Sequence, residues 1–168
     1  MARKRVNHPT ASIGLHGFYR VAITDPDGKV VGDSGVQHNL IVSSGLTNYL
    51  TYVFAKSAGS SVIEMAALGS GNTLIATDST IIPGDAGTAL YKTCAKTFIT
   101  RAASAGGDTA RFTATWVSGT STVNVGAVGL VGTTGVKFFC GGTYATSSVA
   151  INQALNLTYD VVFIASAS

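Results

Sequence analysis

At 168 residues, the chain is long enough to bury a core as one domain, and a second domain is not expected. Only 11% of the residues are charged, against about 25% in an ordinary soluble domain. The formal net charge of +3 comes from Arg3, Lys4 and Arg5, since the rest of the chain has as many anions as cations. Three adjacent cations neutralise only about three phosphates, so nucleic acid is not the expected partner. Such a weakly charged chain is expected to hide surface in an assembly.

The sequence contains no run of about 18 apolar residues, so no membrane-spanning helix is expected. The N-terminus lacks the apolar region of a secretory signal, which predicts folding in a cytoplasm. Cys94 and Cys140 each lie in an apolar run and are expected as buried free thiols, with a disulfide between them as the alternative.

Residues 1–15 are predicted as a basic N-terminal arm and residues 16–168 as a single domain. Alternating apolar residues predict a first strand at His16–Thr24. The turn at Asp25–Gly28 predicts a hairpin into Lys29–Val31, and Val36–Val42 alternates again.

One short helix is predicted at about residues 44–56, where serines can cap the start and an apolar stripe follows. After a strand at Val62–Leu68, a long connection runs to about Gly87. Loops of that length are often functional, so this one is a candidate for partner contacts through Ile81, Ile82 and Pro83.

The C-terminal half alternates short apolar runs with turns. Its predicted strands are Leu90–Arg101, Ala110–Val117, Val123–Val131, Val136–Cys140, Ser148–Gln153 and Leu155–Ile164. Gly126 and Gly129 interrupt one of them, which indicates a bulge or a close backbone approach. The whole pattern predicts an all-β sandwich with jelly-roll or Greek-key connections.

Motifs for catalysis are missing from the sequence. Glu64 is the sole glutamate, which excludes paired glutamates, and no Gly-x-Ser-x-Gly nucleophile elbow occurs. His8, His16 and His38 lack the companions of a metal site. We therefore expect no enzyme, no cofactor and no metal.

A glycan-binding site needs an exposed aromatic side chain with polar neighbours. Strand parity places Trp116 in the core with Phe112. Tyr144, next to Gly141-Gly142-Thr143, is the better exposed candidate for a glycan contact.

The order of several short motifs resembles that of tailed-bacteriophage virion structural proteins, between about Gly17 and Ile164. They are Asn39-Leu40-Ile41-Val42, Ser44-Gly45-Leu46, Ala67-Leu68-Gly69-Ser70-Gly71, Thr77-Asp78-Ser79-Thr80, Val128-Gly129-Leu130 and Leu157–Ile164. The chain departs from the group at Gly126-Ala127-Val128, where a glutamate is common. The resemblance implies a structural role in a virion and no catalytic residues.

These observations lead us to expect a capsid decoration or cement protein, made in the host bacterial cytoplasm and located in the virion. Its partners would be the major capsid protein and copies of itself, with a trimer as a plausible homo-oligomer. Arm cations Arg3, Lys4 and Arg5 would meet acidic groups of the shell. The alternatives are a tail, collar or fibre component that contacts tail proteins, a glycan-binding adhesin domain, and a small capsid protein whose arm meets the genome.

Overall fold

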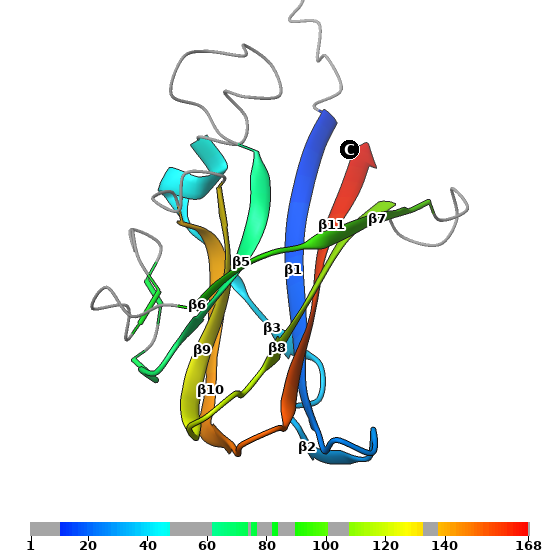
Figure 1. Ribbon diagram of the computed structural model, residues 1–168. Coiled ribbons are helices and arrows are strands. Elements are labelled where there is room, and N and C mark those ends of the chain that lie inside the picture. The colour runs from blue at the N-terminus through cyan, green and yellow to red at the C-terminus, as the bar shows by residue number, and fades with distance from the viewer. Residues whose placement is uncertain are drawn as a thin grey trace, which may run out of the picture.

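Two antiparallel sheets face each other in the structure, a computed structural model (Figure 1). It describes residues 11–47, 62–73, 75–76, 82–83, 90–100, 108–132 and 138–167. The fold is an all-β sandwich, as the sequence predicts, and residues 43–47 form a short helix at the start of the predicted one. The rest of that predicted helix lies outside the described residues.

The first sheet has the strand order β2 (Val30–Asp33), β1 (Ala11–Thr24), β11 (Ala154–Ala167), β8 (Asp108–Val117) and β7 (Ala95–Ile99), with β3 (Gln37–His38) also paired to β1. The second sheet has the order β4 (Leu40–Ile41), β10 (Phe138–Val149), β9 (Val123–Gly132), β5 (Ile63–Gly69) and β6 (Leu90–Thr93).

The two longest strands, β1 and β11, pair along their whole length, from Ala11 with Ala167 to Thr24 with Ala154. Strand β1 therefore begins at Ala11 instead of His16, and the predicted arm of residues 1–15 is too long. Ala11, Ser12 and Gly14 have weak strand propensity and interrupt the apolar pattern, so the sequence alone does not reveal this pairing. The predicted hairpin that follows β1 is confirmed, with Gly28 at φ +84°.

Both sides of the sandwich are closed by a segment that passes from one sheet to the other. On one side β3 joins the first sheet and β4 the second, with Asn39 between them. On the other side β6 joins the second sheet and β7 the first, with the buried Cys94 between them (Figure 1). The sequence predicts one continuous strand at Val36–Val42 and another at Leu90–Arg101. Alternation of apolar and polar residues indicates which face of a strand is buried, but not the sheet to which the strand belongs.

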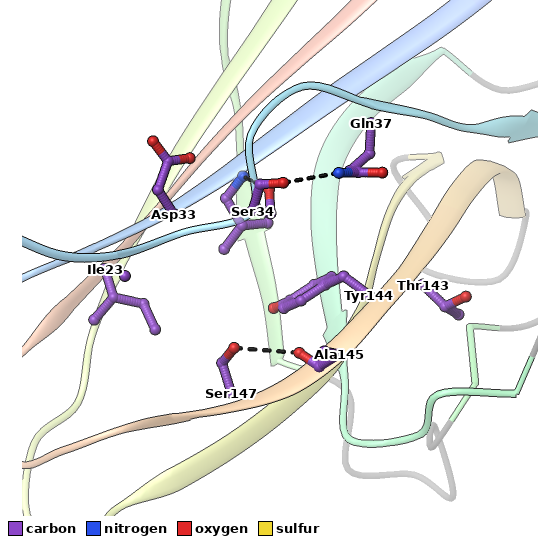
Figure 2. A pocket seen from close by; sticks show the side chains of 10 residues that line it. Ile23, Asp33, Ser34, Gln37, Thr143, Tyr144, Ala145 and Ser147 are labelled. Carbon is purple, nitrogen blue, oxygen red and sulfur yellow. Dashed lines mark hydrogen bonds between the residues drawn. The ribbon is translucent and has the colours of Figure 1, made fainter.

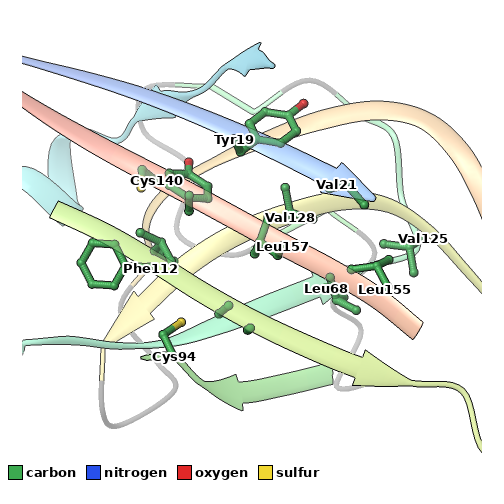
Figure 3. Close-up of a cluster of buried hydrophobic side chains, with 14 of the residues drawn as sticks. Tyr19, Val21, Leu68, Cys94, Phe112, Val125, Val128, Cys140, Leu155 and Leu157 are labelled. Atoms are coloured by element: carbon green, nitrogen blue, oxygen red, sulfur yellow. The ribbon is translucent and has the colours of Figure 1, made fainter. Parts of the chain in front are cut away.

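The main core lies between the sheets (Figure 3). Leu155, Leu157 and Tyr159 project into it from β11, and Phe112 and Ala114 from β8. Trp116 packs against the same cluster, as strand parity predicts. Cys94 and Cys140 are both buried as free thiols, which confirms the expected core role.

A second apolar cluster covers the outer face of the second sheet. It consists of Val42, Ala67, Ile82, Ala127, Val131 and Phe138. The segment around Pro83 lies against the end of β5, where a Cβ at Gly69 would clash with the Pro83 carbonyl oxygen. The part of the long connection at Ile82 and Pro83 therefore packs on the outer face of the second sheet. Strand β9 is consequently buried on both faces.

Candidate ligand pocket at the β10 bulge

Strand β10 contains a three-residue bulge. It lies on the side of the sandwich where the chain passes from β3 to β4 through Asn39. Thr143 pairs with Ala127 and Ser147 with Val125, so residues 144–146 stand opposite Gly126 alone. Bulges re-aim side chains and are frequent next to functional sites. Here the bulge brings Tyr144 to the gap between β10 and the segment that follows β2.

A pocket of about 320 Å³ lies at this gap. We call it the bulge pocket; its lining residues are Val21, Ile23, Gly32, Asp33, Ser34, Gln37, Thr143, Tyr144, Ala145 and Ser147. In Figure 2 the Tyr144 hydroxyl points away from β10, toward the space framed by Ile23, Ser34 and Ser147. Strands β1, β2 and β3 of the first sheet, the β2–β3 connection and β10 contribute to its wall.

The Tyr144 hydroxyl is buried and has no hydrogen-bond partner. Burial raises the pKa of this phenol, with a smaller contribution from neighbouring Tyr19, so the group stays protonated. The Tyr19 hydroxyl, in contrast, donates to the Thr143 carbonyl at 2.9 Å. Tyr144 is therefore only partly exposed, in contrast to the exposed platform that the sequence predicts, because the bulge folds its ring into the gap.

The one charged residue among the described lining residues is Asp33, and its charge is already paired. Arg20 donates to both Asp33 oxygens, with Nε at 3.0 Å from Oδ1, and the Gly35 amide donates to Oδ1 at 2.8 Å. The hydrogen bonds from Arg20 and then from Gly35 lower the pKa of Asp33 to about 2. Asp33 is thus ionised at the edge of the pocket, and the positive charge of Arg20 compensates its negative charge.

The remaining lining groups are hydrogen-bonding side chains and small apolar surfaces. The Gln37 amide donates to the Ser34 carbonyl at 2.8 Å, and the Ser147 hydroxyl donates to the Ala145 carbonyl at 3.2 Å (Figure 2). Val21 and Ile23 supply apolar surface from β1. This mixture suits reversible binding of a small hydroxylated molecule.

The other predicted contact residues lie elsewhere. Outside the described residues are Arg3, Lys4, Arg5 and Ile81. Ile82 is 2% exposed and packs in the second cluster, so its side chain is committed to this chain's own core and is not available to a partner. Pro83 is partly buried, and its carbonyl accepts a hydrogen bond from the Gly71 amide at 3.3 Å. Of the three partner contacts predicted in the long connection, Ile82 is therefore ruled out, and Ile81 lies outside the described residues.

Sequence reasoning found Tyr144 but missed its companions Ser34, Gln37, Thr143 and Ser147. Thr143 and Ser147 are close to Tyr144 on β10 itself. Ser34 and Gln37 are far from it in sequence, and only the pairing of β1 with β2 and β3 brings them to β10. The sequence gives one indication of the site: it predicts an irregularity at Gly126, and Gly126 is the residue opposite the bulge.

Within the described ranges, no three His, Cys, Asp or Glu side chains gather as a metal site would require. None of the helical residues described forms a helix long and apolar enough to cross a membrane. Comparison of the chain with protein-family models, curated proteins and solved structures returns no match.

Proposed function

We propose that this chain is a non-enzymatic structural protein of a tailed-phage virion, a decoration protein that stabilises the head shell as a homo-oligomer. The sequence resemblance supports the virion, and the β-sandwich with its apolar surface supports an assembly role. A trimer would present several arms and loops to the shell at once, so that modest contacts add up. A tail, collar or fibre component is the alternative location.

The observation that carries the proposal is the exposure of large apolar side chains on a weakly charged surface. Phe98 is 63% exposed, Val117 65% and Val36 70%. Several of the described charges are also paired, as Arg111 is with Asp160 at 2.7 Å. Scattered exposed apolar residues are ordinary, but among the described residues three ion pairs reduce the number of free charges on the surface.

The segment formed by β6 and β7 is the part of this surface best placed for contact. It is the outer strand of both sheets on its side, and all of its described residues except Cys94 and Ile99 are exposed. Leu90, Tyr91 and Phe98 add apolar surface along it. Lys92 and Lys96 on the same segment oppose indiscriminate strand pairing, which favours a specific partner.

Sedimentation velocity of the full chain tests the assembly role. A phenylalanine side chain buries roughly 150–250 Å², so the exposed 63% of Phe98 is worth about 2–4 kcal/mol at about 25 cal/mol per Å² if it is covered. We expect Phe98→Asp to weaken self-association at least about tenfold. Thr113→Asp, on an exposed strand position of the same sheet, is the matched control and should associate normally.

A monomer at every concentration, with no affinity for shell or tail proteins, would contradict the proposal.

Particle stability tests the attachment to the shell. Deleting residues 1–9 should release the protein from intact particles and make the heads less resistant to heat. If the heads keep the truncated protein and their heat resistance is unchanged, residues 1–9 do not attach the protein to the shell.

A further inference from the structure

We propose that the bulge pocket binds a single neutral sugar ring. This function is additional to the virion role and does not depend on it. The argument rests on the size of the pocket, its polar groups, its charge and the unpaired hydroxyl of Tyr144.

Size restricts the ligand. Sites for small molecules have volumes of roughly 300–1,000 Å³, and the bulge pocket, at about 320 Å³, is at the small end of that range. One hexose ring is therefore a better match than an oligosaccharide. A longer glycan would place one terminal residue in the pocket and extend into solvent.

The lining matches the two faces of a sugar ring. Ser34 in the β2–β3 connection and Gln37 on β3 provide hydrogen-bonding groups, and Thr143 and Ser147 provide them from β10. Because the Ser34 and Ser147 hydroxyls already donate to backbone carbonyls, their oxygens would accept hydrogen bonds from sugar hydroxyls. Ile23 offers apolar surface for the C–H groups of the ring.

Charge selects against ionised ligands. The carboxylate of Asp33 is paired with Arg20, and the other described lining residues are uncharged. An acidic sugar would meet no unpaired cation among them, so its charge would lose water without a compensating partner. A neutral sugar avoids this cost.

Tyr144 supplies the anchor. Its hydroxyl is a protonated donor with no partner in the protein, at the tip of a ring that the bulge directs into the pocket (Figure 2). A buried polar group without a partner is unfavourable, so a ligand oxygen that accepts its hydrogen bond gains affinity. To reach that oxygen, the ring must turn so that the hydroxyl, which is buried in the structure, faces the pocket.

The test uses saturation-transfer NMR with the full-length protein and four neutral probes: glucose, galactose, mannose and N-acetylglucosamine. Glucuronate is the charged comparator. We expect at least one neutral probe to bind with a Kd on the order of 1 mM, and Tyr144→Phe to weaken it about tenfold. Tyr91→Phe removes the same group on β6, outside the pocket lining, and should leave binding unchanged.

The proposal would be overturned by no signal from any neutral probe, or by tighter binding of glucuronate. Equal loss in Tyr144→Phe and Tyr91→Phe would also overturn it, because the binding would then lie elsewhere. If Tyr144→Phe does not fold, Gln37→Leu changes an exposed lining residue and serves the same comparison. Failure here leaves the Phe98-dependent self-association intact, so the two proposals fail separately.

Discussion

Removing one hydroxyl from Tyr144 and one from Tyr19 should shift stability in opposite directions. The Tyr19 hydroxyl donates to the Thr143 carbonyl at 2.9 Å, and losing such a bond costs about 0.5–1.5 kcal/mol. The Tyr144 hydroxyl is buried without a partner, and an unsatisfied buried group costs about 1–3 kcal/mol. We therefore expect Tyr19→Phe to destabilise the protein by about 1 kcal/mol and Tyr144→Phe to stabilise it by a similar amount.

Urea unfolding of both variants and the wild type measures this difference. With a slope of about 1–3 kcal/mol per molar urea, a gap of about 2 kcal/mol separates the two midpoints by about 1 M. The slope should be the same in all three proteins. If Tyr144→Phe is as destabilising as Tyr19→Phe, the Tyr144 hydroxyl is bonded in solution and is not free for a ligand.

Three further outcomes follow from the packing and the pKa directions. Gly69→Ala should lower the free energy of unfolding by about 1–3 kcal/mol because of the Pro83 carbonyl, and a thermal scan with an unchanged midpoint would refute that packing. Asp33 has a pKa lowered to about 2, below its usual 3.8, so the stability it contributes is present above pH 3.8 and lost as the pH falls toward 2. NMR titration of its carboxyl carbon should show that midpoint, and a midpoint near 4 would mean that the ion pair is absent. Burial raises the pKa of Cys94 to about 11 and of Cys140 to about 12, so a disulfide-exchange reagent at pH 8 should label neither in the native protein and both in urea. Rapid native labelling would contradict their burial.

The sequence predicted the architecture well because most strands have one wet face. Along β8, Phe112 and Ala114 alternate with Thr113 and Thr115, and the pairing with β11 keeps that alternation. The predicted hairpin between the strands that became β7 and β8 is also confirmed.

The sequence failed where tertiary contacts override local pattern. Asn39 and Cys94 each lie inside a run that alternates like one strand, yet the chain changes sheets there. Ile82 is predicted as a contact residue in a loop, but it packs in the apolar cluster on the second sheet. Strand β10 was divided into two predicted strands, because Gly141 and Gly142 interrupt the apolar pattern.

The site was predictable only in part for the same reason. Tyr144 stood out as an aromatic residue beside glycines, but no local signal indicates that Ser34 and Gln37 approach it. Their proximity depends on which strands pair with β1.

Electron microscopy of purified particles that carry a label on the C-terminus of this chain tests the virion role most directly. The account predicts label at regular positions on the head shell. Label confined to the tail would replace the decoration role with the tail alternative. Particles without any label, from cells that make the labelled protein in quantity, would contradict a structural place in the virion.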